Sequence, residues 1–457
     1  MQLNVGQVAA TLGLMAAGLL GTSPAQAQAQ AQDATPAASA PGNAYDQTAS
    51  ETGTTVVDSA VLFYQEDDHR VRAIEADSGA TWNMASGTVL SAKFTYDSLT
   101  GATPNGATRS RWFQRFSAPA KRGAESGGPL PMLDTITGAS GSYMVMPGQL
   151  PLDSHFKDHR EAVDVGATLP VADGLKLSLG GSVSYETDYR SFSGRVSLAK
   201  ELNQKNTTLS LGFNFERDTS QPFTGIPRAL SGMGDYIVGH ARSKRIYSLV
   251  AGVTQVIRPN WLVQLNYNFG HNAGYQTDPY KLVSLVDSTT GDPYFYIYEK
   301  RPERRDRQSI YLGSKLALGS FVTDASARYY HDSWGIDALT FELSEHVPVG
   351  RSFYIAPLAR WYHQTAADFY RPYLAIDAAT PDAVSSDSRL GRFGAWTAGI
   401  KAGAHISSGI ELYVAGERYW QYGQRYDPSA PGHLAHVDLF SGTRSYSVMS
   451  GLRLTFR

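Results

Sequence analysis

The feature that most constrains the fold is an alternation of apolar and polar residues, with a period of two, along most of the chain after residue 56. In "GLKLSLGGSVSYE" (174–186), leucine, valine and tyrosine fall on one face of an extended chain, and lysine, serine and glutamate on the other. The pattern recurs over 206–217, 396–406 and 445–457. Strands of soluble sheets average about five or six residues. These segments run to about 10 to 14, which is typical of strands that cross an outer membrane with one face towards lipid.

The connections between these segments fall into two length classes. Short connections lie at 85–87, 171–174, 201–206, 257–260, 318–321, 347–350 and 407–409, and long ones at roughly 100–158, 218–243, 271–303, 366–388 and 425–443. Outer-membrane barrels have short periplasmic turns and long outer loops. The seven short turns join fourteen strands, and strands near 57–66 and at 444–457 bring the total to about sixteen, within a range of about 14 to 18. We therefore predict an all-β, antiparallel, up-and-down transmembrane β-barrel over 56–457 in a Gram-negative outer membrane.

The N-terminal sequence predicts export. The apolar stretch from Val8 to Leu20 is shorter than the roughly 20 residues that span a bilayer, and Ala25-Gln26-Ala27 fits a signal-peptide cleavage site. We predict a signal peptide over 1–27 and a disordered periplasmic leader over 28–55, which is rich in Ala, Pro, Ser and Thr and carries only acidic charges. An even strand number places both chain ends in the periplasm, as this leader requires.

The segment "YDSLTGATPNGATRS" (96–110) ends one predicted strand and opens the longest loop, 100–158. We expect a strand over 88–98 and a turn from Thr100 to Gly106, in which Gly101 and Gly106 supply positive φ and Pro104 fixes the backbone. Asp97 and Asn105 are expected to hydrogen-bond this turn. The alternative is a loop that folds into the barrel, as the constriction loops of porins do.

Two stretches carry a family resemblance: "YDSLTGATPNGA" (96–107) and "RVRAIEA" (70–76). They resemble an uncharacterised outer-membrane family, catalogued as domain of unknown function 3570. The usual form of that family has Ser where Thr103 stands and often Glu-Pro where Glu75-Ala76 stands. The resemblance implies an outer-membrane barrel. It also implies an envelope redox setting, because members of the family often accompany flavin-transferase and thioredoxin-like proteins.

The alternation assigns a set of charged side chains to the lumen. Positive and negative members nearly balance, whereas a selective ion pore usually shows a ring or stripe of one sign. About sixteen strands leave an aqueous channel unless loops fill it. We therefore predict a passive or weakly selective channel for small polar solutes. The lumen-facing candidates are Lys93, Asp97, Lys176, Glu186, Arg195, Glu216, Arg307, Lys315, Asp324, Arg328, Arg360, Lys401, Glu411 and Arg453.

Metal, cofactor and catalytic signals are sparse. His155 and His159 are four residues apart beside Asp153 and Asp158, a metal-ligand spacing on a helix, but no helical pattern surrounds them. We predict no metal site and no cofactor, with this histidine pair as a weak candidate. No catalytic motif is present, so we predict no enzyme. A barrel-wall hydrolase built from His363 or His405 with an inward serine remains the second alternative.

The predicted partners follow from the membrane setting. The cluster "KRPERRDR" (300–307) at the outer rim could hold anionic lipopolysaccharide, and the penultimate Phe456 resembles the C-terminal signal read by the barrel-insertion machinery. A net charge of −2 argues against nucleic-acid binding, and the absence of cysteine excludes thiolate sites and disulfides. The main alternative to a channel is a non-conducting barrel that anchors or sheathes an envelope protein, for example one involved in redox traffic. The oligomeric state is left open.

Overall fold

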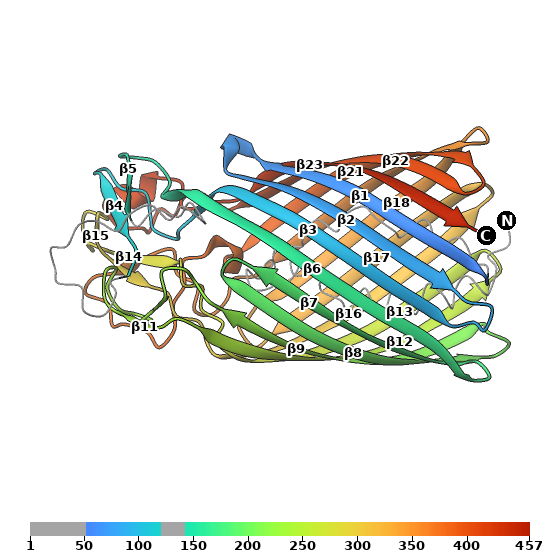
Figure 1. Cartoon of the computed structure of the whole chain (residues 1–457). Coiled ribbons are helices and arrows are strands. Elements are labelled where there is room, and N and C mark those ends of the chain that lie inside the picture. Colours follow the sequence, from blue (N-terminus) through green and yellow to red (C-terminus); the bar gives the residue numbers. More distant parts are fainter. Residues whose placement is uncertain (1–51, 120–141) are drawn as a thin grey trace.

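A closed barrel of sixteen antiparallel strands forms the protein in the computed structural model, which describes residues 52–119 and 142–457 (Figure 1). β1 pairs with β23 to close the wall, for example Val57 with Leu454. The structure confirms the predicted barrel and its sixteen strands. In order around the wall they are β1 (Thr54–Glu66), β2 (Val71–Asn83), β3 (Val89–Pro104), β6 (Leu152–Ala172), β7 (Leu175–Glu186), β8 (Tyr189–Leu202), β9 (Thr207–Ser220), β12 (Arg242–Arg258), β13 (Trp261–Gly274), β16 (Arg304–Leu318), β17 (Phe321–Asp332), β18 (Asp337–Val349), β19 (Phe353–Gln364), β21 (Phe393–Ser407), β22 (Ile410–Gly423) and β23 (Arg444–Phe456).

The alternation of side chains sets the two faces of the wall. On β9, Leu209, Leu211 and Phe213 are 46%, 52% and 42% exposed and face outwards. Thr208 and Asn214, which face inwards, are buried. A row of exposed apolar side chains on a transmembrane wall faces lipid, so the outer surface is the membrane-contacting one and the protein lies in the outer membrane.

Helical structure is minor. The described residues contain only the 3-10 turns η1 (Asp67–His69), η2 (Ser388–Leu390) and η3 (Gly432–His436), and in that part of the chain no helix has the length and apolarity to span a membrane.

The connections at the end of the barrel that carries the C-terminus are short, and they match the seven predicted turns. The opposite end carries the long connections, which identifies it as the outer end. Three outer connections are short as well: β1–β2, β7–β8 and β17–β18.

The long outer connections fold into additional sheets beyond the barrel strands, at the left of Figure 1. We call these connections the outer cap: residues 109–119, 142–151, 221–241, 275–303, 365–392 and 424–443. Residues 105–108 follow β3 directly and are counted with the end of the barrel wall. The cap contains a β4–β5 hairpin, a β10–β11 pair and a three-stranded sheet of β15, β14 and β20. Their bounds are β4 (Gln114–Ser117), β5 (Ser142–Val145), β10 (Ile226–Pro227), β11 (Ile237–Gly239), β14 (Leu282–Val286), β15 (Pro293–Tyr298) and β20 (Leu374–Ala375).

The predicted limits of the first long loop were too wide. β3 continues to Pro104, and β6 already begins at Leu152, because both strands extend beyond the turn chemistry that the sequence suggested. The predicted turn from Thr100 to Gly106 is therefore mostly strand, with a bulge after Gly101 and the turn itself at 105–107. The predicted signal peptide and most of the predicted leader lie outside the described residues.

Candidate functional site

Most of the predicted lumen charges lie on the inward face of the wall in cross-strand ion pairs. The separations are 2.9 Å for Lys93–Asp77, 2.5 Å for Arg160–Asp97, 2.9 Å for Lys176–Glu201, 2.5 Å for Arg195–Asp164, 3.2 Å for Lys315–Asp324 and 2.7 Å for Arg453–Asp58, and Arg360 pairs with Glu342. Each pair joins different strands, so the wall carries both signs side by side. Such a surface gives a solute polar contacts without a net field of one sign.

The remaining candidates make other contacts. Lys401 lies over the ring of Tyr413, 4.2 Å from its centroid. Glu411 accepts a hydrogen bond of 2.6 Å from Tyr354. Arg307 donates to Asn272 over 3.0 Å, and Glu216 accepts from Ser191 over 3.4 Å. Arg328 lies opposite Tyr311 in the strand register. Glu186 belongs to a cluster of three acidic residues.

The cap crosses the outer mouth of the barrel. The 275–303 connection leaves β13, ninth in the barrel order, and returns in β16, the tenth, yet it contacts the end of β3, the third strand. Lys281 donates to the carbonyl of Pro104 over 2.5 Å, and the Leu282 amide donates to the carbonyl of Asn105 over 2.7 Å. The segment therefore spans nearly the full width of the mouth.

Apolar clusters join the connections to one another. Phe116 and Val145 of the first long connection pack with Leu282 and Tyr298 of the 275–303 connection. Val283 and Ile297 pack with Val384 of the 365–392 connection. Val286 packs with Leu434 of the 424–443 connection. The cap thus has a hydrophobic core of its own and is a folded unit.

An ionic cluster lies buried inside the cap. Arg301 is 1% exposed and donates to Glu299 over 2.6 Å and to Asp387 over 2.9 Å. Arg389 also holds Asp387, and the amide of Asp278 donates to Glu299 over 2.8 Å. Burial alone would raise the pKa of Asp387, but the neighbouring cations hold it well below its ordinary value. The cluster ties the 275–303 connection to the 365–392 connection.

The glycine-rich motif forms the docking point for the cap. Gly106 has φ +95°, and a Cβ there would lie 2.4 Å from the carbonyl oxygen of Leu282. The side chain of Asn105 accepts from the Ala107 amide over 2.9 Å, and the Thr108 amide donates to Ser284 over 3.0 Å. The positive φ values expected at Gly101 and Gly106 are present. Asp97 was expected to bond the turn as well, but it pairs with Arg160 instead.

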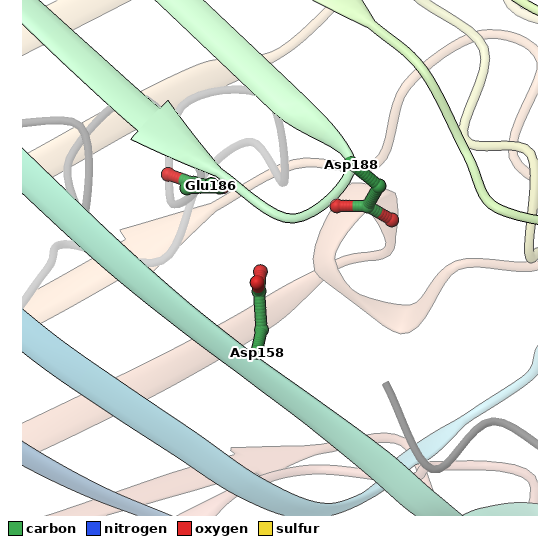
Figure 2. Close-up of side chains that lie close together, drawn as sticks. All are labelled: Asp158, Glu186 and Asp188. Carbon is green, nitrogen blue, oxygen red and sulfur yellow. The ribbon is translucent and has the colours of Figure 1, made fainter. Parts of the chain in front are cut away.

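Three carboxylates meet at the outer end of the wall (Figure 2): Asp158 of β6, Glu186 at the end of β7, and Asp188 in the turn to β8. One oxygen from each lies within 4.8 Å of the others, a spacing at which they could hold a divalent cation. Tyr280 of the cap donates to Asp188 over 2.7 Å. Burial raises the pKa of Asp188 to about 6.

The predicted histidine pair does not have helical spacing, because both residues lie on strand β6. The His155 side chain lies outside the described part, and His159 is exposed, with Nδ1 3.4 Å from the Thr187 hydroxyl. The hydrolase candidates are not brought together: His363 stacks on Trp361 on the outward face of β19, and His405 lies near the inner end of β21 beside Tyr354.

The cluster at 300–307 is divided between two surfaces. Arg301 and Arg305 point inwards and are each 1% exposed, while Arg304 points outwards. The sequence predicted that the whole cluster lies at the outer rim, and it did not predict that Arg301 is buried in the cap. Its partner Asp387 lies far along the chain, and no local pattern links the two.

A family model described as "Protein of unknown function (DUF3570)" matches residues 9–453. No curated protein matches. Among solved structures, CdiB from Acinetobacter baumannii is 7% identical with a TM-score of 0.42, over 88% of this chain and 60% of that one. A bacterial polysaccharide outer membrane secretin is 9% identical with a TM-score of 0.42, over 89% and 99% of the two chains. The outer membrane protein OpdK from Pseudomonas aeruginosa is 8% identical with a TM-score of 0.38, over 88% and 99%.

Proposed function

This chain belongs to the family described as "Protein of unknown function (DUF3570)", and we propose that it is an outer-membrane channel for small polar solutes whose outer entrance is closed by the cap. Conduction then requires the cap to move away from the mouth. The observation that carries the proposal is the combination of a charge-paired, polar wall with a separately folded cap across the same lumen.

The wall supports transport of polar solutes. Sixteen strands enclose a space wide enough for water, and the inward hydroxyls, amides and paired charges offer hydrogen bonds along it. Since the two signs of charge alternate, we expect little preference between anions and cations.

The cap supports gating. Its 275–303 connection contacts the barrel end through polar bonds, from Lys281, Leu282 and Tyr280 to Pro104, Asn105 and Asp188. Phe369 and Leu390 of its 365–392 connection pack on Trp334 and Ile336 of the β17–β18 turn. Its internal contacts include three apolar clusters and the buried ionic cluster. Opening would therefore break the polar bonds at the end of β3 and at the β7–β8 turn, while the apolar clusters within the cap stay packed.

The same internal packing favours a second candidate, a non-conducting barrel. In that candidate the cap never opens, and its outer surface serves as the platform for an envelope partner.

Single-channel recording in planar bilayers separates these candidates. The chain has no cysteine, so Thr108→Cys with Ser284→Cys introduces the only thiols, at two positions whose backbone amide and side chain are 3.0 Å apart. We expect rare openings from the unmodified protein, none from the oxidised double variant, and their return on reduction. Ser284→Cys alone is the matched control.

A cap deletion completes the test. Replacing residues 279–298 with a short Gly-Ser linker should give steady current. Silence from the unmodified protein with steady current from the deletion would favour the non-conducting barrel. Silence from both would exclude a channel.

A further inference from the structure

We infer that the outward faces of β8, β9, β12 and β16 form a binding site for the phosphorylated headgroup of an outer-leaflet glycolipid, lipopolysaccharide. The site is the basic patch, which consists of Arg190, Arg217, Arg245 and Arg304. All four side chains are exposed, and all four occupy outward positions at the outer ends of their strands.

The strand register places these arginines in one line. Arg217 of β9 is directly opposite Arg245 of β12, and Arg245 and Arg304 are each directly opposite Ala273 of β13. Arg190 is opposite Thr219 and so lies diagonal to Arg217. Directly opposite residues on one face have Cβ atoms about 5 Å apart, and diagonal ones about 7–8 Å. The small side chain of Ala273 leaves the space between Arg245 and Arg304 open.

Four positive charges so close together need a counter-charge. Like charges directly opposite one another destabilise a sheet. In residues 52–119 and 142–457, the structure gives none of the four an ion pair. Elsewhere this chain supplies carboxylates for its arginines, as in Arg160–Asp97 on the wall and Arg418–Asp67 on the rim. The nearest outward acid in the register is Asp306, which is bound by His271 over 2.5 Å. A bound anion would satisfy the unmatched charge.

The layers above and below the arginines identify the kind of anion. On the membrane side of Arg217 and Arg245, two positions along each strand, the rings of Phe215 and Tyr247 contact each other with their centroids 5.3 Å apart. On the outer side of the same arginines, also two positions along each strand, the hydroxyls of Thr219 and Ser243 lie 3.0 Å apart. Aromatic rings mark the interface between acyl chains and headgroups. The arginines therefore lie at the level of the headgroup phosphates, with hydroxyls above them at the level of the sugars.

This order of layers fits a phosphorylated glycolipid: acyl chains against the aromatic rings, phosphate on the guanidinium groups and sugar hydroxyls near Thr219 and Ser243. Arginine binds phosphate through two parallel N–H···O bonds. The rim cluster at 300–307, from which lipopolysaccharide binding was predicted, contributes only Arg304 to this surface.

The test uses the full-length barrel in detergent and measures bound lipid by native mass spectrometry. The probes are bis-phosphorylated lipid A, fully dephosphorylated lipid A and inorganic phosphate. We expect the phosphorylated lipid to bind at least tenfold more tightly than the dephosphorylated one. R217Q/R245Q should weaken it about 30-fold, at roughly fivefold for each arginine near an anionic lipid surface. R217K/R245K, which keeps both charges, should lose much less.

The matched control is R72Q/R444Q, which removes two exposed outward arginines on β2 and β23, outside the patch. It should bind like the unmodified protein. Heat-dependent migration in gels reports folding, and R190Q/R304Q provides a second test if R217Q/R245Q does not fold. Equal binding of both lipids, unchanged binding by the patch variants, or an equal loss in R72Q/R444Q would overturn the site. Inorganic phosphate binding as tightly as phosphorylated lipid A would overturn its assignment to a lipid.

Discussion

Replacing Arg301 with methionine should loosen the cap without disturbing the barrel. Arg301 is fully buried and satisfies two carboxylates, those of Glu299 and Asp387. Without Arg301, the carboxylate of Glu299 loses its guanidinium partner, and the charge of Asp387 is compensated only by Arg389 and Lys281. Removing one partner from a buried ion pair costs about 3–5 kcal/mol. The methionine fills a similar volume, so this cost reflects charge more than a cavity.

Hydrogen exchange measures the effect directly. The amides of Lys300 and Val384, each bonded to the other's carbonyl over 2.9 Å, report the junction between the two connections. A loss of about 3–4 kcal/mol should speed their exchange by about 10²- to 10³-fold, since each 1.4 kcal/mol is about tenfold. The amide of Val250, in the barrel wall, should exchange at an unchanged rate.

Two comparison variants make the result specific. R371Q removes an exposed arginine of the same connection, which donates only to backbone carbonyls, and it should change exchange little. E299L combined with R301M removes both charges and should recover much of the protection. Acceleration below about tenfold in R301M would refute the view that this cluster holds the cap together.

Other predictions concern the acidic cluster and the glycines. The pKa of Asp188, raised to about 6 by burial, means that its stabilising contribution is complete below pH about 4 and is lost as the pH rises through about 6. The contribution is up to about 3 kcal/mol, so the protection factor of amides near Asp188, which is the intrinsic exchange rate divided by the observed rate at the same pH, should rise on acidification. D188N should remove that rise. Gly101→Ala places a Cβ 1.9 Å from a backbone oxygen at φ +133° and should destabilise the barrel by at least about 3 kcal/mol in thermal unfolding, unlike Gly194→Ala, where the space is open. Gly106→Ala places a Cβ 2.4 Å from the carbonyl oxygen of Leu282, so it should push the 275–303 connection of the cap away from the motif and increase channel openings. An unchanged opening rate would contradict the docking role of the motif.

The strands of the wall could be predicted from the sequence because residues close together in the chain determine where each strand lies and which side chains face the lumen. A period of two fixes which side chains share a face, as in 206–217, and glycine and polar residues mark the inner turns. Strand number follows from counting those turns. The ends of β3 and β6 were misplaced because turn residues such as Pro104 can also end an extended strand.

The cap was not predictable in the same way. Glu299 and Arg301 meet Asp387 through chain folding at long range, and no spacing rule connects them. The sequence suggested a loop folded into the barrel as an alternative, but not that several connections share one core. Leu282 and Val384 stand in segments without a repeating pattern, so their burial depends on partners that only the three-dimensional structure brings together.

The cap also dictates an order of assembly. Its parts come from connections spread between β3 and β23, and the barrel closes only when β23 pairs with β1. Glu299 and Arg301 lie on one connection and Asp387 on another, so the ionic cluster can form only after both connections have reached the outer side. Their charges keep the travelling segments soluble in the periplasm and oppose early collapse. The cap is completed last, on the cell exterior, where Asp387 first meets Glu299 and Arg301.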